Sequence, residues 1–227
     1  MSTDDFSFAA NAADFNQHIR ASIPDYESLF EKCISLSRRF IQPDTIVLDM
    51  GCSTGALLSS IRTRMRHSRR GVQYLGIDVE PEFVAYWQER SGRDIQFKLS
   101  DVRAIDRFSN VSFACSLFTV QFIPAKDKVL LLKSLYEGLV DGGSFLIAEK
   151  IFAATARLQD ALTYPYYDFK LNQGFTAAEV LDKERSLRGQ MTLWTRSELD
   201  TALRDVGFRE LETIWESFPF TAVLAVK

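Results

Sequence analysis

The amino-acid sequence predicts an α/β fold with a seven-stranded, mostly parallel sheet and an antiparallel last strand, plus N-terminal helices and a helical cap insertion. Three observations lead to this prediction. Short apolar runs of strand length alternate along the chain with stretches of helical spacing, as repeated β–α–β units require. A glycine-containing loop follows the first apolar run. An acidic residue ends the second run about 30 residues later, which is the length of one β–α–β unit.

The loop after the first predicted strand is the clearest ligand-binding motif of the chain. Residues 45–48 are β-branched or apolar, residues 49–55 read Asp-Met-Gly-Cys-Ser-Thr-Gly, and a helical pattern begins at Ala56. Glycines let a backbone approach a ligand closely, and the N-terminus of the following helix offers unpaired N–H groups. The loop is not a dinucleotide fingerprint, because Ser53 replaces its middle glycine, and it lacks the Gly-Lys-Ser/Thr of a P-loop.

The Asp-x-Gly-Cys-x-x-Gly form of this loop resembles motif I of class I S-adenosylmethionine (SAM) enzymes. In those enzymes the loop holds the methionine part of SAM, and the acid at the strand end usually faces its ammonium group. The resemblance implies a Rossmann-like class I methyltransferase fold, with SAM as the methyl donor or as the substrate itself. The implied cofactor-binding residues of the loop are Asp49, Gly51, Cys52, Ser53 and Gly55.

Length and composition limit the possible functions. With 227 residues we expect an N-terminal helical lid at 1–42 and a SAM-binding α/β domain at 43–227, with a cap insertion at about 151–194. The formal net charge of −3 gives no global case for nucleic-acid binding. No apolar run reaches the ~20 residues of a membrane span. Three separated cysteines indicate neither a disulfide framework nor a zinc site, so we expect a reduced, cytoplasmic setting and no metal.

Two helices are predicted before the first strand. Phe15 and His18 lie at helical spacing, so a short helix is expected near 12–21. Asp25 is a candidate N-cap for a second helix, whose apolar stripe begins at Tyr26. In the class I fold such N-terminal helices often close over the cofactor, and Tyr26 would then face it. The alternative is that Tyr26 only packs in a helix interface.

An arginine-rich stretch follows the motif I helix. Five arginines in nine residues invite an RNA-binding hypothesis, but cations also favour the exposed C-terminal end of a helix. We therefore predict a solvated helix end and no nucleic-acid partner, and His67 in the same stretch is not expected to be catalytic. The arginines are Arg62, Arg64, Arg66, Arg69 and Arg70.

The second predicted strand, residues 71–78, ends in Asp78. In nucleoside-binding α/β folds an acid at this place accepts hydrogen bonds from the ribose hydroxyls, so Asp78 is the ribose candidate. A helix and a third strand at 95–99 follow, and after them come Asp101 and Val102. At that place class I members hold the adenine amino group with an acid. The alternative for Asp101 is a helix or turn cap.

The fourth predicted strand, residues 111–117, is followed by a short aromatic stretch with two polar side chains. Ligands of open α/β sheets bind beyond the carboxyl ends of the strands, which makes this stretch part of the predicted site. The site residues predicted here are Leu117, Phe118, Thr119 and Gln121. A helix then ends at an Asp-Gly-Gly turn, and a fifth strand follows at 144–149.

The last third of the chain interrupts the alternation of strands and helices. Residues 151–193 form an aromatic-rich block that we interpret as a helical cap. A helix at 198–206 and an antiparallel hairpin, with strands at 209–216 and 221–226, are predicted to complete the fold.

The resemblance can be narrowed to one family. From about Ile19 to the C-terminus the chain resembles carboxy-SAM synthases, which convert SAM and prephenate into carboxy-SAM for tRNA wobble-uridine modification. The kinship implies that Tyr26, Asp78 and Asp101 contact the cofactor, and it makes a homodimer an expectation because the related synthases are dimers. The matching segments are residues 20–26, 39–43, 49–53, 118–122, 148–150 and 168–170.

The chain departs from that family at its carboxylate-binding residues. In the family an asparagine follows the fourth strand, and here that place is Leu117. A Lys-Arg-Ser stretch of the family's cap supplies the arginine that pairs with the added carboxylate. Here the sequence reads Lys-Glu-Arg-Ser, so Glu184 takes that place unless a one-residue shift restores Arg185. A glutamate would repel the carboxylate. Tyr166 and Tyr167 replace the family's histidines.

We therefore expect an aromatic pocket around the sulfonium, a cation that ring faces stabilise by roughly 0.5–2 kcal/mol. Three reactions stay open: methyl transfer to a small-molecule substrate, carboxy-SAM synthesis if Arg185 serves, and cyclisation of SAM to azetidine-2-carboxylate with release of methylthioadenosine, as in natural-product pathways. A non-catalytic SAM-binding subunit is a further alternative. The expected rings are Tyr26, Tyr164, Tyr166, Tyr167 and Phe169, and the catalytic candidates are Tyr26, Tyr167, Thr119 and Gln121.

Overall fold

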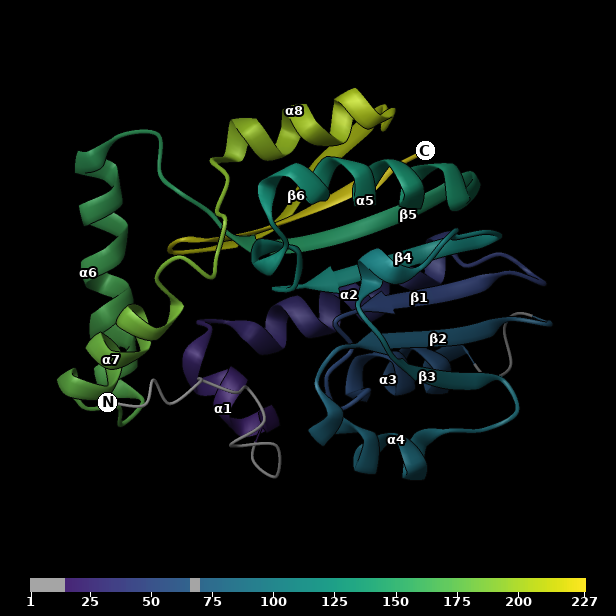
Figure 1. Cartoon of the computed structure of the whole chain (residues 1–227), viewed down its shortest axis with the longest axis horizontal. Helices are drawn as coiled ribbons and strands as arrows, with labels where there is room; N and C mark the ends of the chain where they lie inside the picture. Colours follow the sequence, from purple (N-terminus) through teal and green to yellow (C-terminus); the bar gives the residue numbers. More distant parts are fainter. Residues whose placement is uncertain (1–14, 66–69) are drawn as a thin grey trace.

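The computed structural model describes residues 15–65 and 70–227 of the chain. A sheet of seven strands lies at its centre, in the order β3-β2-β1-β4-β5-β7-β6 (Figure 1). The strands are β1 (Ile46–Met50), β2 (Gln73–Asp78), β3 (Ile95–Leu99), β4 (Val111–Leu117), β5 (Leu139–Lys150), β6 (Glu210–Ser217) and β7 (Phe220–Val226). The α-helices are α1 (Phe15–Ser22), α2 (Tyr26–Phe40), α3 (Ala56–Met65), α4 (Val84–Arg90), α5 (Ala125–Gly138), α6 (Ala156–Asn172), α7 (Ala177–Leu187) and α8 (Arg196–Val206). Short 3-10 turns are η2 (Pro81–Phe83), η3 (Val102–Ala104) and η4 (Val120–Phe122).

The strand directions confirm the predicted fold class. The sheet is parallel except at β7, which runs antiparallel to both of its neighbours, β5 and β6. The chain passes from β1 outward to β2 and β3, then returns to the opposite side of β1 with β4. The strand order therefore reverses between β1 and β4. In open α/β sheets this switch point is where ligands bind, outside the carboxyl ends of the strands.

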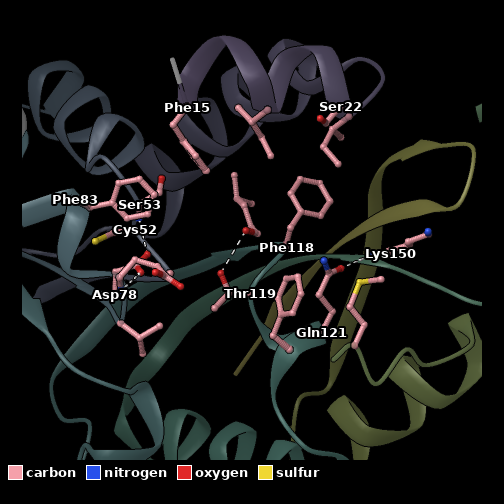
Figure 2. Close-up of a pocket in the computed structure, with 18 of the residues that line it drawn as sticks. Phe15, Ser22, Cys52, Ser53, Asp78, Phe83, Phe118, Thr119, Gln121 and Lys150 are labelled. Atoms are coloured by element: carbon pink, nitrogen blue, oxygen red, sulfur yellow. Dashed lines mark hydrogen bonds between the residues drawn. The ribbon is translucent and has the colours of Figure 1, made fainter. Parts of the chain in front are cut away.

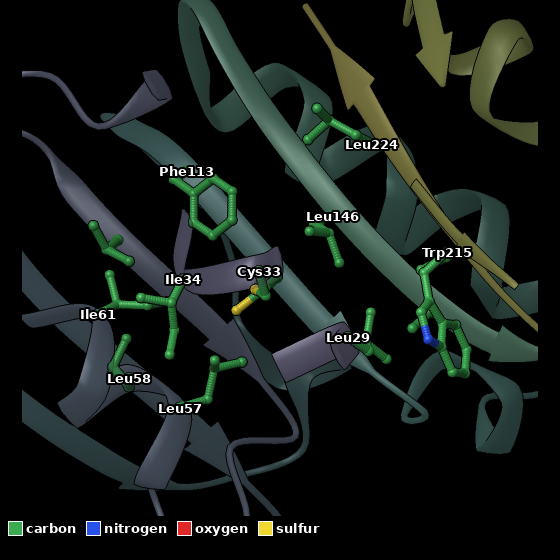
Figure 3. Close-up of a cluster of buried hydrophobic side chains, with 14 of the residues drawn as sticks. Leu29, Cys33, Ile34, Leu57, Leu58, Ile61, Phe113, Leu146, Trp215 and Leu224 are labelled. Carbon is green, nitrogen blue, oxygen red and sulfur yellow. The ribbon is translucent and has the colours of Figure 1, made fainter. Parts of the chain in front are cut away.

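Two apolar layers hold the helices on the sheet, because successive side chains of a strand point to opposite faces. Phe113 and Cys115 of β4 are buried in the layer that α2 and α3 cover, whereas Ala114 is buried in the layer that α5 and α8 cover. Figure 3 shows Ile34 and Leu58 in the first layer, together with Phe113. This packing fixes the strand ends, and so fixes the loops that follow them.

Helices also stand beyond the carboxyl ends of the parallel strands. Figure 1 shows α1 and the pair α6–α7 at this end of the sheet. The Tyr166 hydroxyl of α6 donates a hydrogen bond to the carbonyl oxygen of Ser22, the last residue of α1, 3.1 Å away. The two segments are thus tied together. That residues 1–42 act as a lid and residues 151–194 as a cap over a ligand stays a prediction.

Element boundaries differ from the expected ones in the second half of the sheet. The glycines of the expected Asp-Gly-Gly turn lie inside β5, where the pairing of β4 with β5 shifts in register; glycines suit such irregular strand positions. The hairpin of β6 and β7 closes through two residues, Phe218 and Pro219, and is shorter than expected. The last helix starts at Arg196, because Thr195 and Glu198 form a capping box before it.

The arginine-rich stretch begins within α3, the motif I helix. Arg62 forms an ion pair with Asp94 at 2.6 Å and Arg64 with Glu31 at 2.9 Å, so these two arginines have partners within the fold. Arg66, His67 and Arg69 lie outside the described residues.

Asp25 precedes α2 as expected, but its side chain does not cap the helix. No helix within 15–65 and 70–227 is long and apolar enough to span a membrane.

Candidate active site

A cavity of about 450 Å³ lies at the switch point, between α1 and the cap helices. Small-molecule sites are commonly of this size. Figure 2 shows Asp78 and Ser53 toward one end of the cavity, and Gln121 and Lys150 toward the other. The predicted site residues that line it are Tyr26, Asp49, Gly51, Cys52, Ser53, Asp78, Asp101, Val102, Leu117, Phe118, Thr119 and Gln121.

The two motif I glycines have different tasks. Gly51 donates its N–H to the Ile77 carbonyl oxygen of β2 at 2.8 Å and has a φ of +78°. A Cβ at Gly51 would lie 1.8 Å from Thr119 Oγ1, so only glycine lets the loop reach the segment after β4. Gly55 does not line the cavity. A Cβ at Gly55 would meet the Phe97 ring at 2.5 Å, so Gly55 serves the packing of the turn.

Gly51→Ala is expected to weaken binding of S-adenosylhomocysteine about tenfold, because a strained residue costs on the order of 1–3 kcal/mol and the methyl group displaces Thr119. Isothermal calorimetry measures the affinity. Gly174→Ala is the matched control, since Gly174 also has a positive φ, +94°, but nothing lies within 4 Å of a Cβ there. Equal affinities of the Gly51 variant and wild type would remove the loop from the ligand site.

Asp78, the last residue of β2, combines a structural role with free acceptor capacity. Its Oδ2 accepts the Ser53 N–H at 2.8 Å and its Oδ1 accepts the Glu80 N–H at 3.0 Å. Burial raises the pKa of the Asp78 carboxyl group, and these N–H donors oppose the rise. A carboxylate oxygen has two lone-pair sites. Asp78 can therefore hold the motif I loop and still accept hydrogen bonds from a ligand's hydroxyl groups.

Asp49 of β1 is a buried carboxylate at the edge of the cavity, with 2% of its surface exposed. The Cys115 thiol donates to its Oδ1 over 3.5 Å. Burial raises the pKa of Asp49 to about 7; the thiol hydrogen bond lowers it, and the nearby Asp78 carboxylate raises it further. A buried carboxylate with such a weak donor is stabilised by a cation, so Asp49 suits a ligand's ammonium group.

Asp49→Asn is expected to stabilise the free protein by about 1–4 kcal/mol at pH 8. The pKa of Asp49 is about 7 in the fold and about 3.9 in an unfolded chain. Stability is therefore lost as the pH rises between these values, and asparagine avoids that loss. Urea unfolding of both proteins between pH 4 and 8.5 measures the difference, which should grow up to about pH 7 and then level off. A difference independent of pH would contradict this expectation.

Phe118 forms the apolar wall at the middle of the cavity. Its φ of +61° is unusual for a bulky residue, and its N–H donates to the Ala148 carbonyl oxygen at 2.7 Å. The ring contacts Phe220 at 5.5 Å, and Tyr26 and Trp215 at 6.4 Å between centroids. Backbone strain of this kind gathers at functional sites, so it supports a role for the segment after β4.

The polar groups of that segment are fixed by the backbone around them. Gln121 accepts the N–H of Lys150 on its Oε1 at 2.8 Å (Figure 2), which leaves its NH₂ group as the donor for a ligand. Thr119 donates its hydroxyl to the Leu117 carbonyl oxygen at 3.4 Å. Leu117 itself adds apolar surface to the lining.

The residues expected at the adenine end are present, but Asp101 is already engaged. Its carboxylate accepts the N–H of Arg103 at 2.8 Å and pairs with the guanidinium at 2.6 Å; these bonds to Arg103 hold the pKa of Asp101 below its usual value. Asp101 thus caps η3, the alternative role considered for it. Val102 is buried beside it.

The cysteine of the motif I loop is not reactive. Burial raises the pKa of the Cys52 thiol, so Cys52 is no nucleophile.

The aromatic lining differs from the predicted ring set. Tyr26 and Tyr166 line the cavity, whereas Tyr164, Tyr167 and Phe169 do not. Tyr164 is 66% exposed, and Tyr167 and Phe169 pack against the core that α2 and α3 share with the sheet. Successive residues of a helix point in directions about 100° apart, so the neighbours of Tyr166 leave the cavity. The structure therefore places Tyr164, Tyr167 and Phe169 outside the cavity lining, and a catalytic role of Tyr167 stays a prediction.

The structure decides between the two alignments of the cap. Glu184 lines the cavity and pairs with Lys150, whose Nζ lies 3.3 Å from the Glu184 carboxylate. Arg185 pairs with Asp182 at 3.2 Å, and its side chain is 65% exposed. Glu184 therefore occupies the place toward the cavity, and Arg185 faces solvent.

Sequence reasoning missed a group of basic side chains at the same end. Lys150, Lys170, Lys183 and His18 all line the cavity. Lys150 and Lys170 end two segments, Ala-Glu-Lys and Asp-Phe-Lys, that carry the family resemblance, and this was the available signal. Lys183 and His18 gave none, because their meeting depends on how α7 packs near α1. Among the described residues no group of three metal-binding side chains is found.

Comparisons with known proteins agree with this site. A family model described as a methyltransferase domain matches residues 47–143. A carboxy-S-adenosyl-L-methionine synthase of Staphylococcus epidermidis is 30% identical over 98% of this chain and 96% of its own length. One from Shewanella pealeana is 31% identical over 98% of this chain and 93% of its length. The solved structure of Haemonchus contortus phosphoethanolamine N-methyltransferase 2 in complex with SAM covers all of this chain and 61% of its own, with 15% identity and a TM-score of 0.61.

These matches and the site geometry lead to the same assignment. The methyltransferase-domain match contains the motif I loop, Asp78 and the segment after β4, which together line one part of the cavity. The relatives extend the likeness over the helices that cover it. The chain is an enzyme with SAM as its cofactor, and it belongs to the carboxy-S-adenosyl-L-methionine synthase family within the class I SAM-dependent methyltransferase fold.

Proposed function

We propose that this chain transfers the methyl group of SAM to a small-molecule acceptor and does not form carboxy-SAM. The observation that carries the proposal is the position of Glu184, which faces the cavity in place of the family's arginine, while Arg185 points to solvent. Glutamate cannot supply the paired donors that arginine gives to a carboxylate added to the SAM methyl carbon, and Glu184 takes Lys150 as its own ion-pair partner.

The cavity residues fit SAM as follows. Asp78 would accept hydrogen bonds from the ribose hydroxyls, and Asp49 would face the ammonium group, which suits its buried charge. The backbone around Val102 would contact the adenine ring. Phe118 and Tyr26 would bound the sulfonium with ring faces, which favour cations. When bound, SAM supplies an electrophilic methyl group.

Methyl transfer needs room for an acceptor, and the cavity extends past Phe118 to the cap helices. In the reaction a lone pair of the acceptor forms the bond to the methyl carbon while the carbon–sulfur bond breaks toward sulfur. The products are the methylated acceptor, after loss of its proton, and S-adenosylhomocysteine. The contribution of the enzyme is mainly to hold the two molecules in line, with the NH₂ of Gln121 as a donor to the acceptor.

Cyclisation of SAM is the second candidate, and Asp49 is the observation that favours it. The amine attacks the γ-carbon, methylthioadenosine leaves with the bonding electrons, and one proton is lost from nitrogen. The reacting amine must be neutral. A carboxylate with a pKa near 7 beside the ammonium group is suited to accept that proton near neutral pH.

Product analysis by mass spectrometry tests the proposal. The protein is incubated with SAM alone, with SAM and prephenate, and with SAM and a small-molecule extract of bacteria. We expect S-adenosylhomocysteine only with the extract. Methylthioadenosine and azetidine-2-carboxylate from SAM alone would establish the second candidate instead, and carboxy-SAM in the prephenate sample would contradict both. Heat-treated protein is the control for spontaneous decay of SAM.

A further inference from the structure

The carboxylate of Asp49 depends on a thiol for its hydrogen bonding. The Cys115 thiol donates to Asp49 Oδ1 over 3.5 Å, and no other residue in 15–65 or 70–227 donates to this side chain. The two residues stand opposite each other in the neighbouring parallel strands β1 and β4. Both are buried, and a thiol is a weak donor. The ionised form of Asp49 therefore has a single, weak hydrogen bond within the described part of the chain.

Cys115 remains a thiol at neutral pH and so keeps a proton to donate. Its hydrogen bond with the Cys33 thiol, burial and the Asp49 charge together raise its pKa well above the ordinary value. The proton has two acceptors, Asp49 Oδ1 at 3.5 Å and the Leu48 carbonyl oxygen at 3.6 Å. An ionised carboxylate is the stronger acceptor, so the thiol–Asp49 bond belongs to the charged form of Asp49.

The other groups around Asp49 do not neutralise its charge. The nearby Asp78 carboxylate raises the pKa of Asp49. Tyr26 of α2 and Cys52 of the motif I loop are neutral, because burial and then the Asp49 charge raise their pKa values. No residue in 15–65 or 70–227 forms an ion pair with Asp49. The counter-ion of this carboxylate has to come from a ligand.

We propose that Cys115 is a positioning residue of the cofactor site, whose thiol holds Asp49 ionised and leaves its Oδ2 for the amino group of SAM. Asp49 lines the cavity and Cys115 does not, so the thiol supports the carboxylate from behind. The role rests on the proposed placement of the SAM amino group at Asp49. It does not depend on whether methyl transfer or cyclisation follows.

A pH signature follows from this role. The pKa of Asp49 is about 7 in the free protein, and an ammonium group pairs with the ionised carboxylate only. The affinity for S-adenosylhomocysteine should therefore fall as the pH drops from 8 to 6. Loss of the thiol raises the pKa of Asp49 further, so the fall begins at a higher pH. A loss of packing alone would weaken binding equally at both values.

Calorimetry at pH 6 and pH 8 tests the proposal with S-adenosylhomocysteine and with methylthioadenosine, which lacks the amino acid part. Cys115→Val removes the donor and keeps a side chain that suits a buried strand. It should weaken S-adenosylhomocysteine binding about three- to tenfold at pH 6, which corresponds to a pKa rise of about half a unit to one unit. The change at pH 8, and that for methylthioadenosine at either pH, should stay within about twofold. Cys115→Ala is the second variant if the first does not fold.

Infrared spectroscopy of the free protein tests the hydrogen bond without any ligand. The S–H stretching band of Cys115 is identified as the band that Cys115→Val or Cys115→Ala lacks. It should move to lower frequency between pH 6 and pH 8, because the thiol then donates to an ionised carboxylate. A Cys115 band that does not move with pH would overturn the proposal.

The matched control is Cys33→Val, since Cys33 is a buried cysteine of the same apolar layer (Figure 3) and does not donate to Asp49. It should bind both ligands as wild type does, to within about twofold. Equal weakening of S-adenosylhomocysteine by Cys115→Val at both pH values, or no weakening at either, would overturn the role of Cys115 alone. If the two ligands show the same pH dependence in wild type, the amino group does not lie at Asp49, and the proposed placement of SAM fails together with the role.

Discussion

Asp78→Asn is expected to weaken the binding of SAM and of S-adenosylhomocysteine about a hundredfold. In the wild type the Asp78 carboxylate accepts the N–H groups of Ser53 and Glu80 at 2.8 and 3.0 Å. An asparagine offers one acceptor oxygen and one NH₂ group. In the same orientation its NH₂ group would face a backbone N–H donor, and in any other it would no longer accept the hydrogen bonds of the ribose hydroxyls. Hydrogen bonds to a charged group contribute about 1.5–3 kcal/mol each, and about 2.7 kcal/mol corresponds to a hundredfold change.

Calorimetry with S-adenosylhomocysteine measures this loss, and thermal unfolding shows whether the variant is folded. Glu82→Gln is the control, because Glu82 is exposed on η2 and loses the same charge close by. It should retain the wild-type affinity to within about twofold. A folded Asp78→Asn protein with an unchanged Kd would place the ribose elsewhere in the cavity.

Glu184→Arg is expected to raise the affinity for carboxy-SAM, relative to SAM, by more than about tenfold. Wild type should prefer SAM, because Glu184 faces the cavity and has no donor for the added carboxylate. Arginine at this place provides two parallel donors for it, and hydrogen bonds between charged groups are worth about 1.5–3 kcal/mol. Lys150, released from its 3.3 Å pair with Glu184, adds a second cation.

Competition between the two ligands, followed by calorimetry, measures this preference. The matched control is Arg185→Glu, which makes the opposite change of charge at the neighbouring residue. The Arg185 side chain is 65% exposed and does not face the cavity. It should leave the preference unchanged. A wild type that already prefers carboxy-SAM would contradict the proposed function and favour carboxy-SAM synthesis instead.

The sheet and the acidic end of the site could be predicted because local sequence determines them. The motif I loop needs glycine at position 51, where φ is +78°, and the glycine itself is visible in the sequence. Asp78 was found because it ends the second predicted strand, where nucleoside-binding α/β folds place an acid that accepts hydrogen bonds from the ribose hydroxyls. Both features depend on residues that are neighbours along the chain or in adjacent parallel strands.

The cap could not be predicted to the same depth because a rotation by one residue decides which side chain faces the cavity. Tyr166 lines it and Tyr167 does not; Glu184 lines it and Arg185 does not. Aromatic residues crowd the second half of α6, so the sequence of that half shows no single apolar face. The contacts that fix the rotation, such as the Tyr166 hydroxyl on the Ser22 carbonyl oxygen, join segments far apart in the chain.

A crystal structure of the protein with bound S-adenosylhomocysteine tests most directly the claim that the two ends of the cavity divide cofactor and acceptor. We predict ribose hydroxyls within hydrogen-bonding distance of the Asp78 carboxylate, the amino group at Asp49, and the sulfur beside Phe118. The space next to Lys170 should remain open to a second molecule. A nucleoside bound at Lys170, or an Asp78 carboxylate without ribose contact, would contradict it.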